Sequence, residues 1–387
     1  MAHRVLFLTL KTFSFTGGIE KVCRTICRTL YDIGEEAAAE PMVYSMYDEN
    51  YDRDSRYLKK QQYQGFKGNR KIFVLKAFFK GITADAVILS HVHLLSIGYF
   101  IKRFSPGTKV YLIAHGIEIW KKFPEPKLKA LRRLDKIICV SEFTAEKIKN
   151  IHGIDQKKLE VLNNCLDPFY YFHKEFTKPK DLLKRYGLTE DHTILMSLCR
   201  LSSSEKYKGY DNTLAILPQL VKKYPKLQYL LAGKYDEEEK IRIDKLIAKY
   251  KITDHVKLLG FVDEAEVSDH FLLSDIFLLP SKKEGFGIVF IEAMASGLSV
   301  LGGNKDGSVD ALRNGDLGIL VDPDNLEEIE QALANMLAHP LRHEEKIELQ
   351  KKVLASFNYE DYKESIKSLI LNGTTAFHQL PKHNSYD

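Results

Sequence analysis

PSKKEGFGIVFIEAMASGLSV, residues Pro280 to Val300, is the stretch of sequence that decides the fold. An apolar run ends at Pro280, a Gly-Phe-Gly loop follows at 285 to 287, and a helical pattern begins near Ile288. Backbone N–H groups and the positive end of a helix dipole then point out of the carboxyl end of a sheet. The pattern predicts an anion site, most naturally for a diphosphate. An ordinary glycine turn is the alternative interpretation.

Two glutamates flank this loop. Glu284 precedes it, and Glu292 follows eight residues later, more than one turn into the expected helix. Carboxylates accept hydrogen bonds from the paired hydroxyls of sugars, as in nucleotide-binding sites where one carboxylate holds the ribose. The spacing therefore predicts that each glutamate binds a different sugar, with two surface glutamates as the alternative.

A second polar loop, SLCRLSSSEKYKGYD, spans Ser197 to Asp211. Arg200 ends an apolar run, and Lys208 comes eight residues later, before a glycine. Both cations could reach one diphosphate, where charge-assisted hydrogen bonds are strongest. A merely solvated loop is the alternative for this segment taken alone.

The first half of the chain offers weaker signals. Gly17 and Gly18 follow the first apolar run and allow close approach of a ligand to the backbone. The dinucleotide fingerprint GxGxxG is absent there, which counts against a nicotinamide enzyme. His115 and Gly116 follow another apolar run, at a second expected carboxyl end. A lone histidine is more often structural. The main support for a functional His115 is therefore its position at the carboxyl end of an expected strand.

Short apolar runs alternate with helical patterns along the whole chain, which predicts an α/β fold with parallel sheets in two doubly wound halves. We expect an N-terminal domain at 1–175, a C-terminal domain at 176–357, and a C-terminal helix and tail at 358–387. Strands are expected in the first half at 5–10, 86–90, 110–114, 136–140 and 159–162. In the second half they are expected at 193–198, 227–233, 256–262, 276–281, 298–303 and 318–323.

Composition agrees with a packed protein. Of 387 residues, 44% are hydrophobic and 28% charged, which disfavours disorder. The longest apolar run, residues 86–101, is too short to span a bilayer, and the first residues lack a secretory h-region. Five cysteines, an odd number, favour a reducing compartment. A cytoplasmic location is predicted.

Charge divides unevenly along the chain. Residues 1–175 hold 29 Lys and Arg against 19 Asp and Glu, a net of +10, which leaves −5 for the rest of a chain whose total is +5. Cations interleave with aromatic residues from Tyr51 to Lys80. This pattern fits an anionic membrane surface, a polyanionic substrate or a solvated face. Because no recognised nucleic-acid module is found, nucleic acid is not an expected partner.

Together these motifs, with NNCLDPFYYF at 163–172, resemble the retaining nucleotide-sugar glycosyltransferases of family 4, over residues 3 to about 370. The resemblance implies the GT-B fold: two Rossmann-like domains facing a cleft, the donor held mostly by the second and the acceptor mostly by the first. It also implies that the C-terminal helix returns to the first domain. The expected partners are a nucleoside-diphosphate sugar and a glycan or lipid-linked acceptor.

The resemblance also implies residue roles. The diphosphate would contact Arg200, Lys208 and the backbone near the start of the helix, Glu292 the ribose, Glu284 the transferred sugar, and His115 the sugar near the reacting bond. The implied catalytic set is His115, Arg200, Lys208 and Glu284. The implied donor-binding set is Gly17, Gly18, Gly285, Phe286, Gly287, Ile288, Val289 and Glu292, with Gly260 to Val262 near the base.

Two departures from the family pattern stand out: Cys199 replaces a common glycine, and NKDGSVDAL at 304–312 replaces a proline-glutamate turn, with Asp310 near the acidic position. Retention in this family is thought to use same-face attack assisted by the departing phosphate, so no dedicated base is needed. Acidic triplets at 52–54 and 322–324 are discounted as metal ligands, and no metal or other cofactor is expected.

The sequence thus predicts transfer of a sugar to a hydroxyl with an α linkage, in polysaccharide biosynthesis, by a cytoplasmic or peripheral membrane enzyme. A nucleotide-sugar epimerase or hydrolase on the same fold is the alternative. A sugar-nucleotide-binding protein without catalysis is a third interpretation.

Overall fold

The computed structural model describes residues 2–36 and 39–373. The chain divides into two compact units. The first unit holds residues 1–140, 145–162 and those from Tyr359 on, and the second holds 141–144 and 163–358.

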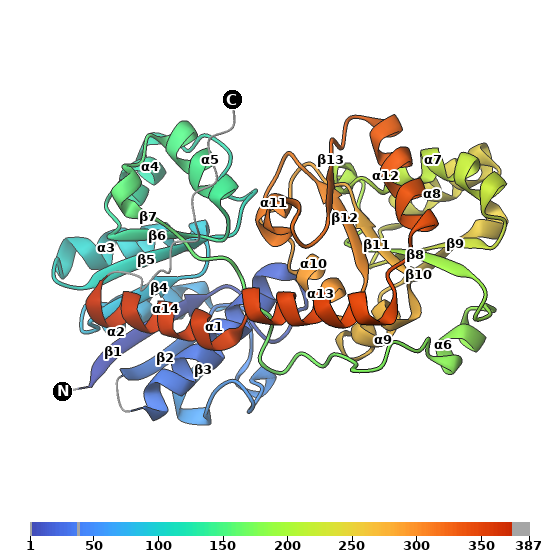
Figure 1. The fold of residues 1–387 in the computed structure, drawn as a ribbon. Helices are drawn as coiled ribbons and strands as arrows, with labels where there is room; N and C mark the ends of the chain where they lie inside the picture. Colours follow the sequence, from blue (N-terminus) through green and yellow to red (C-terminus); the bar gives the residue numbers. More distant parts are fainter. Residues whose placement is uncertain (1, 37–38, 374–387) are drawn as a thin grey trace. The chain divides into compact units, whose positions relative to one another are not determined.

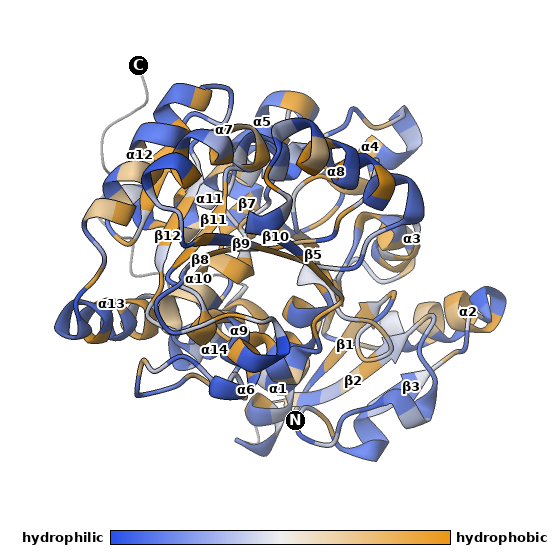
Figure 2. Cartoon of the chain, turned by 90° about the vertical axis from the view of Figure 1, so that its right-hand side faces the viewer, coloured by the Kyte–Doolittle hydropathy of each residue, from blue (hydrophilic) through white to orange (hydrophobic). Residues whose placement is uncertain are grey.

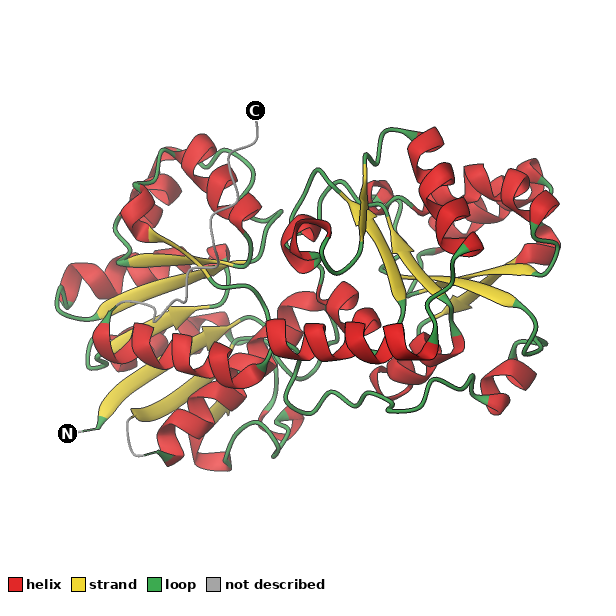
Figure 3. Ribbon diagram, viewed as in Figure 1, coloured by secondary structure: helices red, strands yellow, loops and turns green. Residues whose placement is uncertain are grey.

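The described part of the first unit contains a seven-stranded sheet of order β3-β2-β1-β4-β5-β6-β7, in which every pairing is parallel. Helices cover both faces of the sheet (Figure 3). The strands are β1 (His3–Thr9), β2 (Ala39–Ser45), β3 (Tyr63–Gly65), β4 (Ala86–Leu89), β5 (Lys109–Ala114), β6 (Lys136–Cys139) and β7 (Leu159–Val161). The helices are α1 (Gly18–Glu35), α2 (Arg70–Gly81), α3 (Leu95–Phe104), α4 (Glu125–Arg132), α5 (Glu142–His152) and α14 (Tyr359–Asn372).

Within its described residues, the second unit repeats this plan with a six-stranded parallel sheet of order β10-β9-β8-β11-β12-β13. The strands are β8 (Thr193–Leu198), β9 (Leu227–Ala232), β10 (Val256–Gly260), β11 (Ile276–Leu279), β12 (Ser299–Gly303) and β13 (Ile319–Val321). The helices are α6 (Lys180–Arg185), α7 (Tyr210–Lys223), α8 (Glu237–Tyr250), α9 (Val267–Leu273), α10 (Ile288–Ala295), α11 (Ser308–Ala311), α12 (Leu326–Ala338) and α13 (His343–Ser356). Figure 1 labels these elements.

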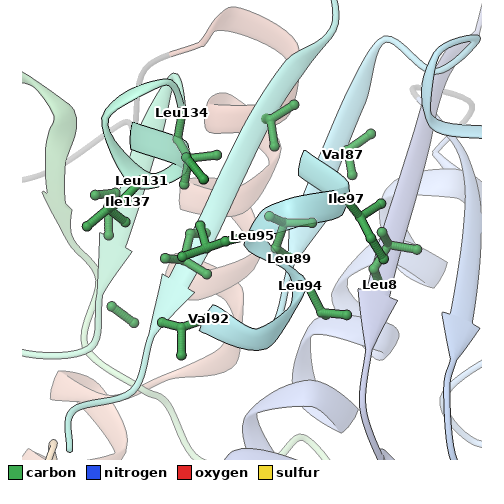
Figure 4. Packing of buried hydrophobic residues seen from close by; sticks show 14 of the residues in the cluster. Leu8, Val87, Leu89, Val92, Leu94, Leu95, Ile97, Leu131, Leu134 and Ile137 are labelled. Atoms are coloured by element: carbon green, nitrogen blue, oxygen red, sulfur yellow. The ribbon is translucent and has the colours of Figure 1, made fainter. Parts of the chain in front are cut away.

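The cores explain why short apolar runs became strands. β4, AVIL, is buried at every position, as is β11, IFLL, because helices cover both faces of a parallel sheet. In the first unit, side chains of β1 and β4 pack against α3 and α4, with Leu8, Leu89, Leu95 and Leu131 among them (Figure 4). A comparable cluster fills the second unit around Leu195, Leu217 and Leu278.

The α/β class and the two doubly wound sheets are confirmed. Each strand predicted from the sequence exists, with boundaries that differ by a few residues. Two strands, β2 and β3, and the helix α2 were not predicted. β2 contains Glu40 and Pro41, and β3 has three residues, so neither shows a continuous apolar run.

The division between the units falls after residue 162, earlier than the boundary expected at 175. The intervening segment packs on the second unit: the Leu166 N–H donates to the Phe357 carbonyl (3.1 Å), and the Tyr170 hydroxyl donates to the Glu292 carbonyl (3.2 Å). An extended segment carries no periodicity, so these contacts leave no mark in the sequence.

The C-terminal helix returns to the first unit, as expected. On α14, the Tyr359 hydroxyl donates to Asp32 (2.7 Å) and Lys367 pairs with Glu36 (2.6 Å), both at the end of α1. The Tyr111 hydroxyl of β5 donates to the Leu369 carbonyl (3.1 Å). Of the helix and tail expected at 358–387, the residues beyond Gly373 lie outside the described residues.

In the described chain, no helix combines the length and apolar character that crossing a bilayer requires.

Candidate active site

The second unit joins two polar loops at the carboxyl edge of its sheet. β8 and β11 are parallel neighbours, so the loops that follow them meet at the same edge. Gly209, at φ +83°, lies so close to the Pro280 carbonyl that a Cβ would stand 2.1 Å from its oxygen. The Tyr207 carbonyl accepts from the Lys282 N–H (2.9 Å) and the Ser281 hydroxyl (3.2 Å). A backbone junction thus holds the two loops together.

Lys208 and Glu284 meet across this junction. Lys208 Nζ donates to Glu284 Oε1 at 2.5 Å, and the side chains are 15% and 13% exposed. Burial opposes the charge of Lys208, but the Glu284 carboxylate more than offsets it, so the pKa of Lys208 is raised. The ammonium therefore stays charged, as a buried paired ion should.

The pairing leaves Lys208 with hydrogen-bonding capacity. An ammonium has three donors, and among the described residues one hydrogen bond from Nζ is found, to Glu284. Two N–H donors of a nearly buried cation remain for a ligand at this edge.

Arg200 follows β8 at the same edge but is more open. Its guanidinium is 62% exposed and pairs with Glu205. Arg200 and Lys208 have a common neighbour, the Tyr207 hydroxyl, whose pKa burial raises. The charged groups that act on this hydroxyl are Lys208, Glu205, Glu284 and Arg200. The structure therefore places Arg200 in the same cluster as Lys208, with its side chain turned to Glu205.

The glycine loop forms as expected before α10. Gly287, at φ +85°, is the residue before the helix, and a Cβ there would stand 2.5 Å from the Phe290 ring. Ile288 and Val289 are the first two residues of the helix, and both are partly exposed. Because the N–H groups of the first helical turn have no partner within the helix, these two are available to a ligand. Phe286 is buried against the Phe357 ring (centroids 5.7 Å apart).

Glu292 lies on α10 and is buried. The Tyr170 hydroxyl donates to its backbone carbonyl, and the charge of Glu292 contributes, after burial, to the raised pKa of Tyr170. The expected ribose carboxylate therefore belongs to the packed part of the helix, whereas Glu284 belongs to the loop.

Asp306, which the sequence interpretation did not single out, fixes the backbone of Glu284. Its buried carboxylate accepts from the Glu284 N–H (2.7 Å) and the Ser308 N–H (2.9 Å). The Gly307 N–H returns a bond to the Glu284 carbonyl (2.8 Å). Burial, and then the charge of Glu284, raise the pKa of Asp306 to about 7. The sequence did hold a signal for Asp306, because it follows β12, the third strand whose carboxyl end lies at this edge.

The first unit has its own polar edge. β1, β4 and β5 are neighbours, and His115 follows β5. Its Nε2–H donates to the Ser90 carbonyl beyond β4 (2.8 Å), and its backbone N–H donates to Glu118 Oε1 (2.6 Å). Burial lowers the pKa of His115. The ring is therefore a neutral imidazole whose Nδ1 is an acceptor.

His91, also beyond β4, belongs to this edge. Burial, and then the neighbouring His93, His115 and Lys127, lower the pKa of His91 to about 3. Its Nδ1 accepts from the His93 N–H (3.2 Å). His91 and His115 are thus two neutral imidazoles at this edge.

The loop after β1 is held by Asp48, a buried carboxylate that sequence reasoning also missed. Its oxygens accept from the N–H groups of Thr12 (2.8 Å), Phe13 (3.1 Å) and Ser14 (3.4 Å). They also accept from the hydroxyls of Ser14 (2.5 Å), Ser45 (2.9 Å) and Tyr63 (3.0 Å). Thirty-odd residues separate Asp48 from this loop in the sequence, so no local spacing could reveal the contact.

Gly17 and Gly18 follow this loop at the start of α1. Gly17 has extended backbone, at φ −165°, so its conformation does not demand glycine. A Cβ on Gly17 would stand 2.6 Å from Glu20 Oε2, whereas a Cβ on Gly18 would meet nothing within 4 Å. The space beside Gly18 is therefore open.

No set of three or more His, Cys, Asp or Glu side chains in the described residues is arranged to hold a metal ion. Asp322 and Asp324, of the second acidic triplet, pair instead with Lys305 (2.6 and 3.0 Å).

Two family descriptions match this chain. "Glycosyltransferase Family 4" matches residues 16–168, and "Glycosyl transferases group 1" matches residues 180–353. Together they span most of both units, and the chain belongs to the family 4 glycosyltransferases. Its two parallel-sheet units have the GT-B fold.

Similar proteins agree with this assignment. The chain is 28% identical over 247 residues to a GDP-mannose-dependent alpha-(1-6)-phosphatidylinositol monomannoside mannosyltransferase of Mycobacterium tuberculosis, covering 61% of this chain and 62% of that protein. It is 29% identical over 216 residues to N-acetyl-alpha-D-glucosaminyl L-malate synthase of Bacillus anthracis, covering 55% and 54%. The chain thus spans less than two thirds of the length of these relatives.

Among solved structures, Anabaena Alr3699/HepE in complex with UDP has a TM-score of 0.76, with 17% identity over 95% of this chain and 100% of that one. At this identity the likeness concerns the fold.

Proposed function

We propose that this enzyme is a retaining glycosyltransferase. It moves a sugar from a nucleoside-diphosphate sugar to a hydroxyl of a glycan or lipid-linked acceptor, forms an α-glycosidic bond, and needs no metal ion. Polysaccharide biosynthesis is the proposed setting.

The observation that carries the proposal is the buried Lys208–Glu284 pair at the joined ends of β8 and β11 (2.5 Å), next to the loop before α10. A diphosphate brings more negative charge than one cation offsets. The spare N–H donors of Lys208 and the amides at the start of α10 supply hydrogen bonds to it. Arg200 adds a second cation once its guanidinium turns from Glu205. Glu284 then accepts hydrogen bonds from the transferred sugar.

The chemistry that follows is leaving-group stabilisation. The bond between the sugar's anomeric carbon and the β-phosphate oxygen breaks, and the acceptor oxygen bonds to the same carbon from the same face. The acceptor's proton passes to the departing phosphate. Lys208 and the helix amides favour the transition state because negative charge accumulates on the phosphate where they point.

The first unit would serve the acceptor and the transferred sugar. A neutral His115 offers Nδ1 to a sugar hydroxyl, since its Nε2–H is engaged by Ser90. The open space above Gly18 would admit the phosphate or acceptor. The mycobacterial relative is named for a phosphatidylinositol mannoside, which supports a lipid-linked acceptor and a cytoplasmic enzyme that is peripheral at the membrane.

A thermal-shift screen of UDP, GDP, ADP and their sugars tests donor binding. A ligand at a hundred times its Kd stabilises the native state by about 2.7 kcal/mol, so a clear rise in Tm with one nucleoside diphosphate is expected. If none of these ligands shifts Tm at millimolar concentration, the proposal fails.

Donor-only incubation separates transfer from the epimerase or hydrolase alternative. We expect slow donor loss without acceptor and fast loss with a lipid-linked or glycan acceptor, unchanged by EDTA. Rapid isomerisation or stoichiometric hydrolysis of donor alone would favour the alternative. Full loss of activity with EDTA, restored by a divalent metal, would refute metal independence.

A further inference from the structure

Helix α2 packs into the first unit by one side and presents apolar residues on the other. Phe73 and Ala77 are buried, one turn apart. Ile72, Leu75 and Phe79 are exposed, the last two by 58% and 57%. At 100° per residue these three lie along one stripe, opposite the buried side. Figure 2 shows hydrophobic colour on α2 near the edge of the view.

The exposed stripe continues onto α3. The Phe78 ring contacts those of Phe79 (5.4 Å) and Phe104 (5.5 Å). Phe104 is 67% exposed, and Phe100, one turn earlier on α3, is also exposed. Two helices therefore share one apolar surface, and soluble proteins rarely leave such a surface without a partner.

The charges on the two helices that form this surface are all positive. Neither α2 nor α3 contains Asp or Glu. Lys71 flanks the stripe on one side, and Lys76 and Lys80 flank it on the other. Within the described residues, Lys71, Lys80 and Arg103 form no ion pair, and Lys76 lies over the Phe66 ring (5.9 Å). An apolar stripe rimmed by cations is the composition of helices that lie in a lipid interface.

Much of the rest of the segment from Tyr51 to Lys80 is buried or paired with other parts of the unit. The rings of Tyr57, Tyr63 and Phe66 are buried. Lys59 pairs with Glu35 (2.7 Å) and Lys67 pairs with Glu49 (3.1 Å). The surface is therefore formed by α2 with the end of α3, and not by the segment as a whole.

A shallow cavity of about 420 Å³ lies beside the stripe, between β3 and the start of α2. Ile72 and Lys76 line it from α2, and Glu49, Asn50, Lys67 and Asn69 are among the residues that line it from the loops. Because Lys67 is paired with Glu49, the donors that this rim offers to a phosphate-bearing headgroup are the Lys76 ammonium and the amide groups of Asn50 and Asn69.

We infer that the α2–α3 face docks the enzyme on an anionic lipid surface. This face comprises Ile72, Leu75, Phe79, Phe100 and Phe104 with Lys71, Lys76, Lys80 and Arg103. In a parallel β-α-β unit the helix begins at the carboxyl edge of the sheet, so α2 starts at the edge that carries Gly18 and His115. The face extends from Ile72, near that edge, to Phe79 and Phe104 at the far ends of α2 and α3, and the purpose of docking rests on the proposed transfer to a lipid-linked acceptor.

Vesicle flotation of the full chain tests the inference. Vesicles of phosphatidylcholine alone are compared with vesicles holding about 30 mol% phosphatidylglycerol. We expect flotation with the anionic vesicles at low salt and loss of flotation near 1 M salt, where charges are screened. Absence of flotation at low salt would overturn the inference.

Two double variants probe the two components of the face. Leu75→Ser with Phe79→Ser removes exposed apolar surface, and Lys71→Glu with Lys80→Glu reverses exposed charges. Each pair is expected to lower the vesicle partition coefficient at least about tenfold. Since all four side chains are exposed, the fold should persist, which an unchanged Tm would verify.

Matched controls lie in the second unit. Ile241→Ser with Leu326→Ser removes comparably exposed apolar residues, and Lys222→Glu with Lys223→Glu reverses two exposed lysines on α7. Both should float like the unaltered chain. An equal loss in these controls would overturn the inference. So would a change of oligomeric state confined to the face variants, because the occupant would then be a second copy.

Activity readouts separate this inference from the proposed function. If the face variants lose flotation but keep the Tm shift with nucleoside diphosphate, docking and donor binding are independent, as expected. If the unaltered chain floats but transfers no sugar, the proposed function fails while the docking face stands.

Discussion

The two units present the same architecture at their sheet edges but different arrangements of charge. In the second unit, Lys208 and Glu284 are buried and paired across two strand ends, and Lys208 retains donors for a ligand. In the first unit, Asp48 is buried at the corresponding edge, and both its oxygens are occupied by backbone and hydroxyl donors. His91 and His115 are held neutral there by burial.

The contrast shows how one strand-helix plan serves two tasks. A carboxylate whose acceptor sites are filled shapes a loop and offers no charge to a ligand. A buried ion pair with unused donors can exchange part of its pairing for an anion. We therefore propose that the diphosphate binds at the second edge and that uncharged hydroxyl groups bind at the first.

The largest expected effect tests the charged edge. Lys208→Ala should lower turnover ~10²- to 10³-fold, because it removes leaving-group stabilisation in a water-poor site. Initial rates at saturating donor measure it. The matched control is Lys178→Ala, which breaks a similarly buried pair with Asp275 (2.8 Å) at the opposite edge of the same sheet. Equal loss in both variants would mean that the effect is structural.

The next prediction concerns Asp306 at the edge of the second unit, whose titration should make the stability of the protein depend on pH. The pKa of Asp306 is raised from its ordinary 3.8 to about 7. Between about pH 4 and 7 the unfolded chain therefore releases a proton that the folded chain keeps, and the free energy of unfolding falls as pH rises. Asp306→Asn lacks this titration. The stability of the unaltered chain relative to the variant should decline by up to about 3 kcal/mol over that window.

Urea unfolding of both proteins at several pH values measures this difference. The Asp306→Asn variant serves as the control, because every other titrating group is the same in both proteins. A difference that stays flat from pH 4 to 7, or grows, would contradict the raised pKa of Asp306.

The first edge is tested through Asp48. Asp48→Asn keeps the shape but replaces an acceptor oxygen with a donor, and should cost about 2 kcal/mol locally. Hydrogen exchange at the amides of Thr12 to Ser14 should accelerate, while nucleoside diphosphate affinity stays unchanged. Asp135→Asn, which removes a carboxylate that accepts the Val110 N–H (2.8 Å) at the other edge, is the control. A tenfold loss of diphosphate affinity in Asp48→Asn would erase the distinction between the edges.

The smallest effect is expected at Arg200. Because its guanidinium is exposed and held by Glu205, Arg200→Ala should leave Tm within error and lower kcat/KM about tenfold, the equivalent of about 1.4 kcal/mol. Steady-state kinetics and thermal melting measure the two quantities. A loss of activity as large as that of Lys208→Ala would mean that Arg200 and Lys208 contribute equally to catalysis, which would contradict this prediction.

The sequence predicted what depends on local pattern. β8 and β11 were readable as apolar runs, and the loops after them contained Lys208 and Glu284. α2 was not readable, because Phe73 and Ala77 face inward while Leu75 and Phe79 face outward, which removes the contrast between helix sides.

Contacts between distant segments could not be predicted. Asp48 meets Thr12 and Asp306 meets Glu284 only through the sheet topology. The burial of Glu292 and the Phe286 side chain likewise depends on what packs against α10. Sequence spacing identified the helix start but not which of its side chains face the ligand.

The central claim is that Lys208 and the amides at the start of α10 bind one diphosphate. The most direct measurement is a crystal structure of the full chain with the nucleoside diphosphate that raises Tm most. The account predicts diphosphate oxygens within hydrogen-bond distance of Lys208 Nζ and of the Ile288 or Val289 amide. A diphosphate bound away from both groups, with the Lys208–Glu284 pair undisturbed, would contradict it.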